Sequence, residues 1–151
     1  MNIAVVTGTS TGIGFETSLH LARNGYFVFA GMRNTKKAQA LIDAASAESL
    51  SVEVIELDVT SSSSLDAAFE VIDAKGPVSL LVNNAGIGAA SPLELTPADE
   101  HRQVFETNYF GTIACIQKVL PAMREQGSGN IVNISSIVGV MATPNQIAYS
   151  A

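Results

Sequence analysis

Charge, cysteine and long apolar runs are all scarce in this 151-residue chain, and each scarcity excludes a class of protein. Charged residues make up only 15% of the sequence and hydrophobic residues 47%, a balance that favours a packed core over intrinsic disorder. The 8 Lys and Arg residues are outnumbered by 14 Asp and Glu residues, so the formal net charge is −6. Because nucleic-acid binding needs a basic surface, we expect no nucleic-acid partner.

Cys115 is the single cysteine, so no internal disulfide can form, which is consistent with a reducing cytosol. We expect Cys115 to be a small apolar residue on a helix. The only histidines, His20 and His101, lie far apart and have no second cysteine to join them, so we expect no metal site. No apolar run approaches the roughly 20 residues of a membrane span, and the apolar start at 3–6 is too short for a signal peptide. We therefore expect a cytoplasmic protein.

Short β-branched runs alternate along the chain with longer helical patterns. The third of these runs alternates apolar and acidic side chains, as an edge strand does, whereas the other four are nearly all apolar, as in strands buried on both faces. The repeated β-α-β order predicts a parallel sheet with right-handed crossovers. We expect strands at 3–7, 26–30, 52–57, 79–82 and 130–134, and helices at 14–24, 35–49, 62–75 and from about 97 to 126.

Capping residues mark the ends of the later helices. Ser62 or Ser63 is expected to cap the third helix, and Gly76-Pro77 to end it. Thr96 is expected to cap the long fourth helix, and Pro121 to kink or locally break it.

A glycine-rich turn over 7–14, with the sequence Thr-Gly-Thr-Ser-Thr-Gly-Ile-Gly, joins the first strand to the first helix. Glycine permits a tight turn and lets the backbone approach a diphosphate, and the helix N-terminus offers free N–H groups to that anion. An ordinary glycine-rich turn is the alternative interpretation. The strand–turn–helix context favours a dinucleotide site, whose residues are Gly8, Ser10, Thr11, Gly12, Ile13 and Gly14.

The end of the second strand bears on which dinucleotide binds. An acidic residue there would accept a hydrogen bond from the ribose 2′-hydroxyl of NAD, but Met32 occupies the place. Arg33 follows, with Lys36 and Lys37 close behind, and a guanidinium suits a 2′-phosphate by charge and paired hydrogen bonds. We therefore favour NADP over NAD; the alternative is that these three cations are a solvated helix start.

Further motifs follow the glycine turn in a fixed order. They are Leu57-Asp58-Val59, Asn83-Asn84-Ala85-Gly86, Asn108, Ile134-Ser135-Ser136, and Tyr149 thirteen residues after Ser136. In combination with the glycine turn, they resemble the short-chain dehydrogenase/reductase family over the whole chain. The resemblance implies a Rossmann-type doubly wound α/β fold, a three-layer αβα sandwich of strand order 3-2-1-4-5, here as one NAD(P)-binding domain over 1–151 without its C-terminal strands.

The resemblance also assigns cofactor contacts. Asp58 would accept a hydrogen bond from the adenine amino group, and Val59 would contact the ring; a strand-end turn is the alternative role of Asp58. Asn83 and Thr7 would tie strands together. The segment that would pass close to the adenosine ribose is Asn84, Ala85 and Gly86.

By the same resemblance, the reaction centre consists of three residues. Tyr149 matches the family's acid–base residue, and Ser136 matches the residue that orients the substrate carbonyl, with Ser135 as the near alternative. Asn108 would help to hold a water in the proton path, partly by distorting its helix. Taken singly, each could have only a packing or capping role.

In the family, a lysine four residues after the tyrosine lowers the pKa of the phenol and binds the nicotinamide ribose. The sequence ends at Ala151, before that position. We expect this polypeptide alone to be marginally stable and nearly inactive, with an unprotected fifth strand.

Three interpretations of function follow. The first is an NADP(H)-dependent oxidoreductase that interconverts a carbonyl and an alcohol, whose parent forms a homodimer or homotetramer. The others are a truncated dinucleotide sensor without catalysis and a structural partner that only uses the fold. An apolar substrate is indicated by Ile87, Leu93, Val138, Val140, Met141 and Ile147.

Overall fold

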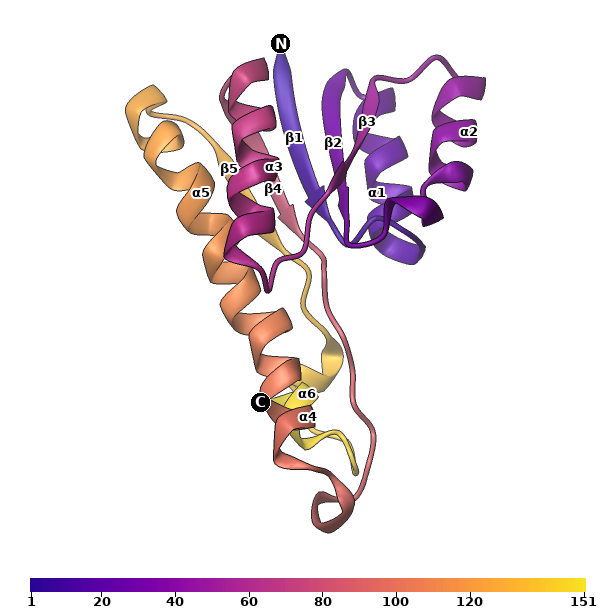
Figure 1. The fold of residues 1–151 in the computed structure, drawn as a ribbon, viewed down its shortest axis with the longest axis vertical. Helices are drawn as coiled ribbons and strands as arrows, with labels where there is room; N and C mark the ends of the chain where they lie inside the picture. Colours follow the sequence, from indigo (N-terminus) through magenta and orange to yellow (C-terminus); the bar gives the residue numbers. More distant parts are fainter.

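Five parallel strands form one sheet in the computed structural model, which describes residues 1–151 (Figure 1). Their spatial order is β3-β2-β1-β4-β5, and every neighbouring pair is parallel. The Rossmann-type order is thereby confirmed, with the alternating third strand at one edge. The strands are β1 (Asn2–Thr7), β2 (Tyr26–Met32), β3 (Val52–Glu56), β4 (Val78–Asn83) and β5 (Asn130–Asn133).

Helices connect the strands and cover both faces of the sheet. None of them combines the length and the apolar character that a bilayer crossing requires. They are α1 (Gly12–Arg23), α2 (Gln39–Ala47), α3 (Ser62–Lys75), α4 (Ala98–Phe105), α5 (Gly111–Gln126) and α6 (Ile147–Ser150). Shorter turns are the 3₁₀ segments η1 (Thr35–Lys37), η2 (Leu93–Leu95) and η4 (Ile137–Gly139) and the π segment η3 (Glu106–Phe110).

The core explains why β1 is apolar at every interior position. Alternate side chains of a strand point to opposite faces, and here both faces are covered. Ile3 and Val5 pack with residues of α3 and α5, while Ala4 and Val6 pack with Ala22 of α1. A third cluster, which includes Leu41 of α2, closes the same face as α1.

Two helix starts differ from the sequence expectation. Ser61, not Ser62 or Ser63, caps α3, and its hydroxyl accepts the Ser64 N–H at 3.3 Å. Pro97, not Thr96, is the N-cap residue of α4. The hydroxyl of Thr96 instead donates to the Pro92 carbonyl at 2.8 Å, so it stabilises the preceding turn.

Two helix interiors also differ. The helix expected over 35–49 is divided into η1 and α2 at Ala38, because Asn34 caps a separate 3₁₀ turn by accepting the Lys36 N–H at 3.0 Å. Pro121 does not break α5, which continues to Gln126. Val119 and Met123, on either side of this proline, are buried in the core and hold the helix against the sheet.

The long fourth helix is present as α4, η3 and α5 in unbroken succession. Its π segment contains Asn108, so the expected distortion at this residue is found. Beyond the sheet, the connections that follow β4 and β5 run alongside this helix, and α6 packs against α4 and η4 (Figure 1). The carboxyl ends of β4 and β5 thus lead into a region separate from α1 and α2.

Candidate cofactor and reaction site

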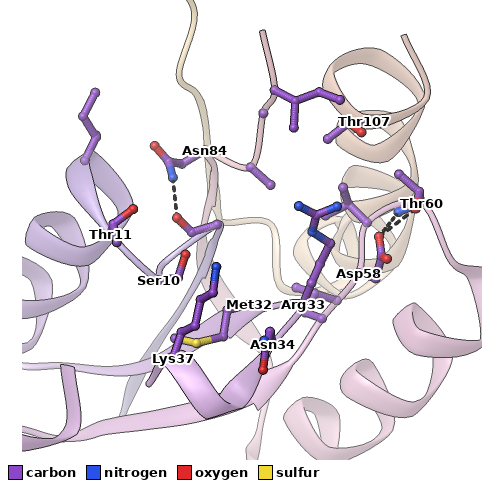
Figure 2. A pocket seen from close by; sticks show the side chains of 17 residues that line it. Ser10, Thr11, Met32, Arg33, Asn34, Lys37, Asp58, Thr60, Asn84 and Thr107 are labelled. Atoms are coloured by element: carbon purple, nitrogen blue, oxygen red, sulfur yellow. Dashed lines mark hydrogen bonds between the residues drawn. The ribbon is translucent and has the colours of Figure 1, made fainter. Parts of the chain in front are cut away.

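A cleft of about 350 Å³ lies at the carboxyl ends of β1, β2 and β4 (Figure 2). Parallel α/β sheets bind ligands at this edge, where the strand order reverses around the first strand. The cleft wall includes ten of the twelve residues expected to contact the dinucleotide. Gly12 and Gly14 do not line it.

Close packing explains the glycines of the turn. Gly8 has a φ of +71°, and a Cβ there would lie 2.7 Å from the Cα of Ala85. A Cβ on Gly14 would lie 2.5 Å from the carbonyl oxygen of Gly8. Thr11, the N-cap residue of α1, makes no side-chain capping bond. The first-turn amides of α1 therefore have no side-chain acceptor and are suited to an anion.

Thr7 and Asn84 lock this turn to β4. The Thr7 hydroxyl accepts the N–H groups of Asn84 and Ala85 at 3.0 and 2.9 Å. The Asn84 amide donates in return to the carbonyls of Thr7 and Gly8, both at 3.0 Å. The bond to Gly8 is dashed in Figure 2. In the next pair of strands, Asn83 donates to the Asn133 side chain at 2.8 Å. The strand-tying roles expected for Thr7 and Asn83 are confirmed.

Asp58 has the strand-end turn role that was the alternative interpretation. One carboxylate oxygen accepts the Thr60 N–H at 2.9 Å and the Thr60 hydroxyl at 2.7 Å, which forms a tight turn after β3 (Figure 2). The second oxygen has no partner in the structure, and Asp58 and Val59 both line the cleft. The turn therefore orients a carboxylate that keeps one free acceptor.

The basic end of the cleft is formed by Arg33 and Lys37, which reach into it from the end of β2 and from η1 (Figure 2). Neither forms an ion pair within the chain. Lys36 does not line the cleft, and Met32 is buried beneath it. Sequence reasoning missed three further lining residues that carry no motif, namely Asn34, Thr60 and Thr107.

A second cavity, of about 480 Å³, adjoins the first. Ile87 and the 84–86 segment line both of them, so a single extended ligand can occupy the two. The second cavity brings together Asn108, Ser136 and Tyr149, and the alternative serine, Ser135, also lines it. Asn108 and Tyr149, about forty positions apart in the sequence, thus line the same cavity.

The polar side chains of the second cavity differ in what they already bind. Asn108 accepts the Ile87 N–H at 2.9 Å and donates to the Ile87 carbonyl at 2.8 Å, so its amide serves to hold the loop after β4. Ser136 accepts the Val138 N–H at 3.3 Å and caps η4. The Tyr149 hydroxyl makes no hydrogen bond within the chain and is available to a ligand.

Of the apolar side chains expected near the substrate, only Ile87 lines these cavities. Four others, Leu93, Val140, Met141 and Ile147, are exposed on the surface, and Val138 is partly buried away from both cavities. Within these 151 residues, the walls around Ser136 and Tyr149 are formed mostly by glycine and polar side chains.

The family model described as short chain dehydrogenase matches residues 2–151. The chain belongs to the short-chain dehydrogenase family. An uncharacterized oxidoreductase of Bacillus subtilis, YusZ, is 40% identical to this family member over 149 residues, covering 97% of this chain and 53% of the relative. The 3-oxoacyl-[acyl-carrier-protein] reductase FabG of Staphylococcus epidermidis is 39% identical over 150 residues, covering 98% and 62%.

Solved structures of short-chain dehydrogenases have the same fold. A gluconate 5-dehydrogenase from Burkholderia cenocepacia, in complex with NADP and tartrate, aligns with a TM-score of 0.90 at 30% identity, covering 99% of this chain and 59% of that one. A variant of actinorhodin polyketide ketoreductase with NADPH aligns with a TM-score of 0.94 at 30% identity, covering 99% and 58%. The chain spans between half and two thirds of the length of these relatives.

Proposed function

We propose that the protein is an NADP(H)-dependent oxidoreductase that interconverts a carbonyl and an alcohol. The observation that carries the proposal is the joining of two cavities along the 84–86 segment. One has an uncapped helix N-terminus and two unpaired cations, and the other has a free tyrosine hydroxyl beside a serine. Both solved relatives described above contain NADP or NADPH, which agrees with this arrangement.

The residues present fit a dinucleotide. The diphosphate is assigned to the amides at the start of α1, with the Gly8 turn giving close backbone approach. The free oxygen of Asp58 is assigned to the adenine amino group, with Val59 against the ring and residues 84–86 beside the ribose. Arg33 and Lys37 are assigned to a 2′-phosphate, because both point into the cleft without an ion-pair partner.

The reaction is assigned to the second cavity. When bound, the nicotinamide supplies or accepts the hydride. In the reducing direction, the Ser136 hydroxyl donates a hydrogen bond to the carbonyl oxygen and orients it, and the Tyr149 hydroxyl delivers the proton to that oxygen as the alcohol forms. The amide of Asn108 holds the loop at Ile87 through two hydrogen bonds, so it keeps the wall of the cavity in place.

Replacing Arg33 tests the choice of cofactor. Arg33→Ala removes a charged donor, so the Kd for NADPH should rise by about 10- to 100-fold, while the Kd for NADH should change by no more than about threefold. Titration calorimetry with NADPH, NADH, adenosine 2′,5′-bisphosphate and AMP measures this.

Lys36→Ala is the matched control. It also removes one positive charge, three positions after Arg33, but the Lys36 side chain does not line the cleft. An equal loss of NADPH and NADH affinity in Arg33→Ala would contradict the phosphate assignment. The carbonyl assignment is tested on the full-length protein by NADPH absorbance with a panel of ketones and aldehydes, and it fails if Tyr149→Phe is as active as the wild type.

A further inference from the structure

We infer that Thr112 is a positioning residue on the proton-transfer side of this site, an inference that rests on the proposed function. Thr112 stands at the start of α5, just after the π segment, and lines the second cavity together with Ser136 and Tyr149. Its hydroxyl donates to the backbone carbonyl of Asn108 at 2.9 Å. No motif identifies this threonine.

The π segment creates the need for such a group. In an α-helix the Gly111 N–H would bond to the carbonyl four residues back, at Thr107, but here it bonds to Glu106, five residues back. The carbonyls of this segment are therefore displaced from the regular ladder. A side-chain donor on the following turn fixes one of them, the Asn108 carbonyl, on the stretch of helix that faces the cavity.

The chemistry of the hydroxyl then limits what Thr112 can do. A hydroxyl has one proton, and this proton is already donated to Asn108. Toward the cavity, the Thr112 oxygen can act only as an acceptor, so it favours a donor such as a water or a substrate hydroxyl. Asn108 cannot easily take this role with its side chain, because that amide is engaged with Ile87 on both of its atoms.

Two isosteric or near-isosteric changes separate positioning from packing. Thr112→Val keeps the volume and removes the hydroxyl, whereas Thr112→Ser keeps the hydroxyl and loses a methyl group. In the full-length protein, with NADPH and the carbonyl substrate that is reduced fastest, kcat should fall about tenfold in Thr112→Val, the loss expected for one hydrogen bond. In Thr112→Ser it should return to within about twofold of the wild-type value. The KM for NADPH should stay unchanged in both.

The solvent isotope effect supplies a readout that packing alone does not move. The ratio of kcat in H₂O to kcat in D₂O should rise in Thr112→Val, because proton delivery becomes slower relative to the other steps, and should stay at the wild-type value in Thr112→Ser. A fall in kcat without a rise in this ratio, or an equal loss in both variants, overturns the inference.

Failure of the proposed function has a different signature. All kinetic measurements here use the full-length protein. If the full-length wild type binds NADPH but reduces no carbonyl, there is no turnover in the wild type or in either variant, and this result overturns the proposed function together with the positioning role. A normal wild-type rate with an unaffected Thr112→Val overturns the positioning role alone.

Discussion

The two cavities adjoin each other but are supported by different parts of the molecule. The walls of the first stand on β1 and β2, whose interior side chains are packed on both faces, with Val5 and Phe29 almost fully buried. The second lies beside β5 and the segments after β4 and β5, where Val140 and Met141 are exposed. Within this chain, the proposed cofactor groups lie on strands of a dense core, whereas local hydrogen bonds hold Asn108 and Ser136 and none holds the Tyr149 hydroxyl.

Core truncation should give the largest contrast between the two regions. Phe29 is 1% exposed and Val140 is 87% exposed. Phe29→Ala should lower the free energy of unfolding by about 3–5 kcal/mol, because it leaves a cavity between β2 and its covering helices. Val140→Ala should change it by less than about 0.5 kcal/mol. Urea unfolding measures both, and comparable losses would show that the two regions are equally packed.

A smaller effect is expected at the glycine turn. Gly8→Ala combines a left-handed φ with a clash against Ala85, and it should weaken NADPH binding by more than about tenfold. Gly127→Ala is the matched control, because its φ of +65° is similar and a Cβ there meets no atom within 4 Å. The control should cost about 1–2 kcal/mol of stability and leave the Kd for NADPH unchanged. Equal Kd values for the two variants would disprove the close-approach argument.

The smallest effect should appear at alkaline pH. Burial in the core raises the pKa of the Cys115 thiol from 9.0 to about 12. The unfolded chain therefore loses this proton at a lower pH than the folded chain. The stabilising contribution of the protonated thiol is complete below pH 9 and decreases as the pH rises toward 12, by about 1.4 kcal/mol at pH 10.

Urea unfolding at pH 7.5 and pH 10, under reducing conditions, measures this contribution. Cys115→Ala should lose about 1.4 kcal/mol less than the wild type between these two pH values. Identical pH dependence of wild type and variant would show that the thiol is not held in the apolar core. The folded protein should also react slowly with thiol reagents near neutral pH.

Several parts of the fold could be predicted from local patterns. A run such as 3–6 is apolar at consecutive positions because both faces of its strand are covered. This pattern predicts the first and last residues of β1, β2 and β4 to within two positions. The sequence pattern ends β2 two residues too early, at Ala30, because a glycine such as Gly31 normally weakens a strand. Gly31 is needed in β2 because a Cβ there would lie 2.7 Å from the Leu57 side chain, a contact between distant residues.

The candidate site also contains residues that local sequence patterns predict and residues that only tertiary packing brings together. The glycine turn, the basic end of β2 and the order of motifs are local features, and they predict ten of the residues that line the first cleft. Asn34, Thr60 and Thr107 were missed because they carry no pattern of their own and reach the cleft only through tertiary packing.

The amino-acid sequence by itself determined the parallel α/β architecture and the family resemblance, because strand burial, helix periodicity and motif order are written in neighbouring residues. Only the tertiary structure decided what each polar side chain is free to do. Asn108 binds Ile87, Thr112 binds Asn108, and the Tyr149 hydroxyl binds nothing within the chain. These outcomes depend on distances between segments that the π turn and the crossovers bring together, and no local pattern specifies such distances.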